Sequence, residues 1–288
     1  MIIDLHIHSK TCSDGNLPVD EIIKEAKTRN INLMSITDHD SIGCQKQAMT
    51  LAQQNNIQYI SGVELNITFS HPNLDKVSSL DLLGYNFDVH NKTLQQKLQQ
   101  ISKYREERAK KILEKLNAEF EKEGLEAFTG DDLKAIQSSA DGALGRPHIA
   151  DYLIRKGIVH DRKEAFNKYL VKCNVPKYPL YLEEASSLLK NAGGITVLAH
   201  PNDPYGTSLV KLTNSLQEQT RIIETSMLQY IDGVECWHSR NTAQTTNHYV
   251  SFSKKHNLIM TGGSDCHQNP IIMGTVKVPD FVAQQFTK

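Results

Sequence analysis

Short apolar runs alternate with amphipathic stretches along most of this chain. Seven runs have the length and composition of buried strands: one that begins at Met1, and those over residues 31–37, 57–63, 79–84, 194–199, 231–237 and 258–261. Apolar residues recur at helical spacing between them, over residues 19–28, 41–55, 182–191 and 242–256. Strand–helix alternation is typical of a parallel sheet, so the pattern predicts an α/β fold closed, or nearly closed, into a barrel.

The alternation stops between about residues 90 and 181, where the pattern predicts no strand. A long amphipathic helix is predicted over residues 95–120, and shorter helices over 131–136 and 148–156. We interpret residues 91–184 as a helical insertion that forms a cap over a barrel built from residues 1–90 and 185–288. The alternative is a separate domain that is unrelated to any functional site of the barrel.

Side chains of the types that bind metals stand at or near the ends of the apolar runs. His6 and His8 lie two residues apart in the first run, so both imidazoles point to one face of a strand. Such a pair alone is at least as often structural as metal-binding, but residues of the same chemistry recur at Asp14, His39, Glu64, Asp81, His200, His238, Asp265 and His267. Parallel α/β barrels place their chemistry at the carboxyl ends of the strands, so a metal site is predicted there.

Composition indicates which partners and which cellular location suit a protein with such a site. The chain has 288 residues and a net charge of −1, which disfavours a surface that grips long nucleic acid. No apolar run reaches the ~20 residues of a membrane span, and no secretory signal is visible. Five cysteines are scattered without a C-x-x-C pair, which favours reduced thiols and a cytoplasmic location.

Several motifs together resemble the PHP (polymerase and histidinol phosphatase) metallohydrolases. They are His6-x-His8, Asp14, residues 37–39, Glu64, residues 199–201 and residues 264–267. Within the insertion, residues 145–150 and 176–178, followed by residues 192–194, resemble the nucleoside-3',5'-bisphosphate phosphatase branch. Members of that branch are also described as 5'-to-3' exoribonucleases that trim short RNA. The resemblance implies a distorted (β/α)7 barrel with a centre of two or three divalent metal ions.

The resemblance also implies a ligand set for each metal. The first would be held by His6, His8, Glu64 and Asp265; the second by Glu64 as a bridge, His200 and Asp81; the third by Asp14, His39 and His267. Mixed nitrogen and oxygen ligands favour Mn, with Fe or Zn as alternatives. Asp81 departs from the family, which usually has a histidine there. Asp4 and Asp38 are expected to orient imidazoles rather than to bind metal.

The function that follows is a metal-dependent phosphoesterase. Its substrate would be a nucleoside 3',5'-bisphosphate that loses the 3'-phosphate, or the 5'-end of a short RNA. His238 or His148 would protonate the leaving oxygen. Arg146, His148 and Lys177 would hold the substrate's other phosphate, although composition alone favours ordinary surface charges for these residues. The alternatives are a histidinol phosphatase and a non-catalytic metal-binding module of a nucleic-acid-processing assembly.

Overall fold

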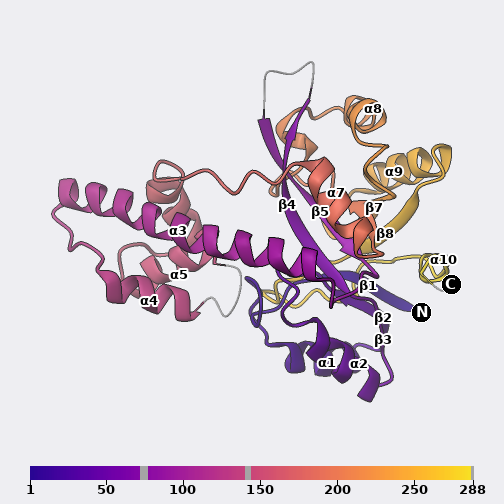
Figure 1. Ribbon diagram of the computed structural model, residues 1–288, viewed down its shortest axis with the longest axis horizontal. Coiled ribbons are helices and arrows are strands. Elements are labelled where there is room, and N and C mark those ends of the chain that lie inside the picture. Colours follow the sequence, from indigo (N-terminus) through magenta and orange to yellow (C-terminus); the bar gives the residue numbers. More distant parts are fainter. Residues whose placement is uncertain (72–76, 140–143, 287–288) are drawn as a thin grey trace.

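The strands pair into two sheets. The computed structural model describes residues 1–71, 77–139 and 144–286, and Figure 1 shows their arrangement. The first sheet is parallel and has the order β1 (Ile2–Ile7), β2 (Ile31–Ile36), β3 (Gln58–Tyr59). The second has the order β4 (Gly62–Ser70), β5 (Val77–Tyr85), β6 (Ile195–Leu198), β7 (Gly233–His238), β8 (Ile259–Gly263).

The second sheet is mixed, so the prediction of parallel pairing throughout is wrong. β4 pairs antiparallel with β5 from Gly62 opposite Tyr85 to Ser70 opposite Val77, and β5 pairs antiparallel with β6. β4 ends at Ser70 and β5 begins at Val77, a separation shorter than the dozen or more residues that a crossover to a parallel strand needs, so the two strands pair antiparallel. Hydropathy gives the length of a strand but not its direction. The predicted strand over residues 57–63 divides into β3 and the start of β4, which places Glu64 inside a strand.

Isolated bridges connect the two sheets. Ile7 at the end of β1 pairs with Cys266 after β8, and His39 after β2 pairs with Glu64 of β4. Closure into the predicted (β/α)7 barrel is not detected among the described strands. These bridges nevertheless bring the ends of β1, β2 and β8 close to Glu64 near the start of β4, which is where the predicted metal ligands lie.

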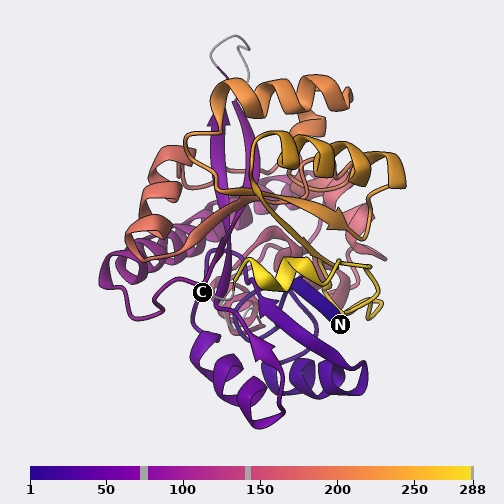
Figure 2. The ribbon, with the colours of Figure 1, turned by 90° about the vertical axis from the view of Figure 1, so that its right-hand side faces the viewer.

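Amphipathic helices cover the sheets, as Figure 2 shows from the side. They are α1 (Val19–Thr28), α2 (Gln45–Gln54), α7 (Leu182–Asn191), α8 (Leu216–Ser226), α9 (Ala243–Lys255) and the short α10 (Phe281–Gln284). Helix α8 was not predicted. Its signal was present, because Ser215 caps it by accepting a hydrogen bond from the Glu218 amide and Ile222 and Ile223 are buried.

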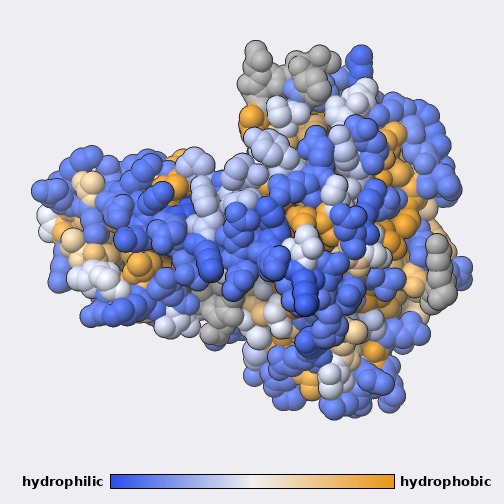
Figure 3. All heavy atoms as spheres, viewed as in Figure 1, coloured by the Kyte–Doolittle hydropathy of each residue, from blue (hydrophilic) through white to orange (hydrophobic). Residues whose placement is uncertain are grey.

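Most of the remaining helices form an arm at one side of the sheets (Figure 1). They are α3 (Lys92–Glu123), α4 (Gly130–Ser139), α5 (Arg146–Arg155), α6 (Arg162–Ala165) and the π-helical turn η1 (Phe166–Leu170). The arm has its own apolar core, which includes Leu116, Phe120 and Tyr169, and its face in Figure 3 is mostly hydrophilic. No helix in the described part of the chain is long and apolar enough to cross a membrane. The division at residues 91 and 184 stays a prediction.

Candidate metal centre

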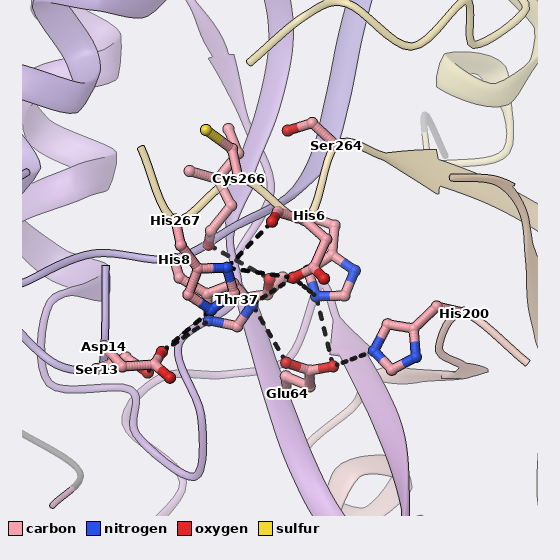
Figure 4. A network of polar contacts seen from close by, with 12 residues as sticks. His6, His8, Ser13, Asp14, Thr37, Glu64, His200, Ser264, Cys266 and His267 are labelled. Carbon is pink, nitrogen blue, oxygen red and sulfur yellow. Dashed lines mark hydrogen bonds and ion pairs between the residues drawn. The ribbon is translucent and has the colours of Figure 1, made fainter. Parts of the chain in front are cut away.

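The Glu64 carboxylate lies close to the imidazoles of four histidines. Its Oε1 is 2.9 Å from His200 Nε2 and 3.4 Å from His6 Nε2. Its Oε2 is 3.0 Å from His39 Nδ1 and 3.2 Å from His8 Nε2. Figure 4 shows the Glu64 carboxylate facing His6, His8 and His200, which come from separate parts of the chain. Each carboxylate oxygen therefore faces two imidazoles, as a carboxylate that bridges two cations would.

A second group lies on the far side of His8. Asp14 Oδ1 is 3.2 Å from His267 Nε2 and 4.0 Å from His8 Nδ1. The rings of His8 and His267 are stacked with their centroids 4.2 Å apart. One ligand atom from each of these residues and from His39 can lie within 4.8 Å of all the others. The structure thus brings together the residues assigned to a third metal.

Asp265 connects the first group to His238. Its Oδ1 is 3.2 Å from His8 Nε2 and 3.6 Å from His6 Nε2, and its Oδ2 is 3.6 Å from His238 Nε2. The backbone of Asp265 has a φ of 54°, and that of His200 has a φ of 22°. Non-glycine residues in this region cost free energy and persist where the surrounding structure requires them. Both residues point a side chain into the cluster from the end of a strand.

Asp81 lies near the cluster but is already hydrogen-bonded. Its Oδ2 is 3.9 Å from His200 Nε2, and its Oδ1 accepts a 2.6 Å hydrogen bond from Asn66 Nδ2. Burial and the nearby Glu64 charge raise the pKa of Asp81. A ligand atom of Asp81 lies within 4.8 Å of ligand atoms of Glu64 and His39. Asp81 can therefore reach a shared cation while Asn66, which sequence reasoning missed, holds its other oxygen.

Glu235 was also missed, although it orients two of the imidazole residues. Its Oε1 accepts a 3.0 Å hydrogen bond from His6 Nδ1, which leaves His6 Nε2 facing Glu64. Its Oε2 accepts from the His200 backbone amide at 2.8 Å. The signal in the sequence was a carboxylate inside an apolar strand, and burial of such a group requires partners.

The expectation that Asp4 and Asp38 orient imidazoles is wrong. Asp4 accepts hydrogen bonds from the amide and hydroxyl of Ser264, at 2.9 and 2.6 Å. Asp38 accepts from the amide and hydroxyl of Ser9, at 2.6 and 2.7 Å. Both carboxylates hold the backbone of loops that carry the candidate ligands, because a serine next to a ligand offers two donors at once.

The donor set fits divalent cations. Within the described residues, His6 Nε2, both ring nitrogens of His8, Glu64 Oε2 and His238 Nε2 are buried without a hydrogen-bond partner. Unpaired buried polar atoms are costly and rare, so their convergence indicates a ligand. Burial lowers the pKa of His8 and His200, but Glu64 and Asp265 outweigh it and raise these values to about 10 and about 9. A bound cation would take the place of these protons.

A cleft of about 690 Å³ opens onto this cluster. Its walls include the cluster residues Asp14, His39, Glu64, Asp81, His200, Asp265 and His267. They also include the cations Arg105, Arg108, Arg146, Arg162, Lys177, Lys211 and Arg240. The helical arm supplies several of these cations, so one cleft joins the cluster to a positively charged wall. Of these cations, sequence reasoning singled out Arg146 and Lys177.

The sequence also predicted substrate-binding and acid residues, and these differ in their position relative to the cleft. His148 lines the cleft, and its Nδ1 accepts a 3.0 Å hydrogen bond from the Gly145 amide. Arg146 lines the cleft with its guanidinium 5.2 Å from the Phe166 ring. Burial lowers the pKa of Lys177, while the charge of Asp81 acts in the opposite direction. His238 does not line this cleft but an adjoining one that shares Asp265 and His267 with it.

Comparison with known proteins agrees with this geometry. The sequence matches the PHP domain family over residues 4–183. It is 27% identical over 270 residues to a 3',5'-nucleoside bisphosphate phosphatase from Chromobacterium violaceum, covering 92% of this chain and 87% of the relative. It is 34% identical over 206 residues to a 5'-3' exoribonuclease from Haemophilus influenzae, covering 69% and 68%.

The fold is also shared with a solved structure. A candidate metal-dependent phosphoesterase from Bifidobacterium adolescentis superimposes with a TM-score of 0.80 at 24% identity, covering 98% of this chain and 94% of the other. The predicted resemblance is thereby confirmed, and the alternative of a non-catalytic module is set aside. Because the PHP match spans well over half of the sequence, this chain belongs to the PHP domain family, and it is a metal-dependent phosphoesterase.

Proposed function

We propose that this chain removes the 3'-phosphate from nucleoside 3',5'-bisphosphates and also accepts short RNA that carries a 5'-phosphate. The observation that carries the proposal is the single cleft in which the carboxylate–imidazole cluster faces a wall of arginine and lysine side chains. Such a cleft suits a substrate with two phosphates, one held at the cluster and the other by the cations. The names of the two relatives point to the same substrates.

The contacts above support an assignment of residues to each metal ion. His6, His8, Glu64 and Asp265 would hold one ion; His200 and Asp81 would share Glu64 at a second; Asp14, His39 and His267 would hold a third. When bound, two or three such ions activate water and stabilise charge on the phosphate. The harder carboxylate at position 81 favours Mn, with Fe or Zn as alternatives.

Arg146 and Lys177 would bind the phosphate that is not cleaved. Both line the cleft, and they come from parts of the helical segment that are separated in sequence. Arg146 is suited to this role because its guanidinium is packed against Phe166 and therefore loses little freedom on binding. The segment over residues 91–184 would thus act as the cap predicted from the sequence.

His148 is the better candidate for the general acid. Its Nδ1 accepts the Gly145 amide hydrogen, so the neutral ring carries its proton on Nε2. His148 lines the cleft and can present that proton to a leaving oxygen. In His238, Nδ1 accepts from the Arg240 amide at 3.3 Å, and Nε2 faces Asp265. His238 therefore suits a role in positioning Asp265.

The test is phosphate release by the Mn-loaded protein from a panel of substrates. Adenosine 3',5'-bisphosphate and a short RNA with a 5'-phosphate should be hydrolysed, and histidinol phosphate should be a poor substrate. Adenosine 5'-monophosphate is the matched control, because it lacks the 3'-phosphate to be removed. Turnover of histidinol phosphate together with no turnover of the bisphosphate would refute the substrate assignment and favour the histidinol phosphatase alternative.

A further inference from the structure

Tyr205 places an exposed aromatic ring on the wall of the cleft. The residue is 83% exposed, more than any other large hydrophobic residue in the described part of the chain. It lines the same cleft as the cluster residues and the cations. A ring that stays in water contributes little hydrophobic stabilisation to the fold. Its exposure beside a phosphate-binding wall therefore raises the question of what covers it.

The backbone that carries Tyr205 is tied to the metal centre. The Tyr205 amide donates a 2.9 Å hydrogen bond to Oδ1 of Asp203, a carboxylate that is 1% exposed. The Asp203 amide donates to the His200 carbonyl at 3.0 Å, and the Ser208 hydroxyl donates to the Asp203 carbonyl. The turn that presents the ring is thus held by several hydrogen bonds and begins at a candidate ligand.

Arg240 spans the distance between the ring and the cluster. Its Nη1 pairs with Asp203 Oδ2 and lies 3.7 Å from Asp265 Oδ2. Its Cζ lies 6.0 Å from the centre of the Tyr205 ring. Only one guanidinium therefore separates the ring from a carboxylate of the metal centre. A nucleotide with a phosphate at the cluster can extend its sugar along Arg240 and place its base at Tyr205.

We propose that Tyr205 is the residue on which the nucleobase of the substrate stacks. This inference rests on the proposed function, and it assigns the substrate class as nucleotides of any base rather than phosphorylated sugars or amino alcohols. Stacking on an aromatic ring tolerates all bases because each base has a π-face, and it fits both a mononucleotide and the terminal base of an RNA. Tyr205 would thus determine specificity without touching the reacting atoms.

The test compares a substrate that has a base with one that lacks it. Tyr205→Ala should raise the KM for adenosine 3',5'-bisphosphate about tenfold, the effect of one lost stack, and leave kcat unchanged. The KM for the base-free deoxyribose 3,5-bisphosphate should not change. Tyr205→Phe should behave as wild type, because the ring and not the hydroxyl is needed. Tyr181→Ala is the matched control, since Tyr181 is 50% exposed but is not among the residues that line this cleft.

A fluorescence measurement detects stacking without relying on catalysis. Wild type and Tyr205→Phe should quench the emission of 2-aminopurine riboside 3',5'-bisphosphate, and Tyr205→Ala should not. Four results would each overturn the proposal. They are equal KM increases for the two substrates, no KM increase, loss of quenching in Tyr205→Phe, and no quenching by wild type. Quenching that depends on Tyr205, in a protein that releases no phosphate from the bisphosphate, would refute the proposed function and retain the stacking role.

Discussion

The metal centre and the cationic wall of the cleft are built in opposite ways. Glu64 and His6 project from strands, His8 directly follows β1, and all three are fully buried. Glu235 accepts hydrogen bonds from the His6 ring and from the His200 backbone amide. Arg146 and Tyr205 project from a helix start and a turn, and they remain accessible from the cleft. The residues assigned to catalysis therefore lie in the rigid, buried part of the molecule. The residues assigned to substrate binding lie at its surface, where a substitution changes the free energy of unfolding little.

Removing Glu64 should have the largest effect and should not distinguish between substrates. Glu64→Ala takes away the carboxylate that faces His6, His8, His39 and His200, and it should lower kcat/KM by about a thousandfold or more for every substrate. Bound metal, measured by elemental analysis after gel filtration, should fall in parallel. Glu183→Ala, on the exposed first turn of α7, is the control. Retained activity would refute the bridging role.

Removing Arg146 should have a smaller effect, and only on substrates with a second phosphate. Arg146→Ala should raise the KM for adenosine 3',5'-bisphosphate roughly tenfold to a hundredfold, the value of one charge-assisted hydrogen bond. The KM for adenosine 3'-monophosphate should stay close to that of wild type. Arg155→Ala, an exposed arginine at the other end of the same helix, is the matched control. An equal loss on both substrates would mean that Arg146 supports the fold or the metal centre instead.

The contrast between the two regions also explains what the sequence could predict. Candidate ligands such as His8, His200 and Asp265 stand where apolar runs end, so strand periodicity found them, and the structure brings them together. Glu235 was hidden inside an apolar run, where only its unpaired charge marked it. Arg240 and Tyr205 lie in loops, and loop residues reach a site through tertiary contacts that no local pattern encodes.

The same limit applies to the fold. Hydropathy located the strands and most of the helices that cover them, because each buries one apolar face. It did not predict that β4 and β5 pair antiparallel, since strand direction depends on the connection and on the partner strand. The consequence for the site is concrete. Within this hairpin, Asn66 lies directly opposite Asp81 and can bind its carboxylate.

The smallest expected effect is a pH dependence that belongs to the metal centre alone. In the metal-free protein, the pKa of His8 is raised to about 10 and that of His200 to about 9, so their protonated forms stabilise the fold. This stabilisation is complete below the ordinary histidine pKa of about 6.5 and is lost as the pH rises through 9 to 10. The Tm of the chelator-treated protein, measured by circular dichroism, should therefore fall between pH 7 and pH 10.

Bound metal should oppose this fall in Tm with pH. Metal binding requires deprotonated imidazoles, and protons compete with the metal for them. The difference in Tm between the Mn-loaded and the metal-free protein should widen from pH 7 to pH 9. His8→Gln should narrow that difference and flatten the slope, whereas His90→Gln, at an exposed histidine outside the cluster, should leave both unchanged. A difference that stays constant with pH would mean that the metal does not displace these protons, and the ligand assignment of His8 and His200 would then fail while Arg146 and Tyr205 kept their roles.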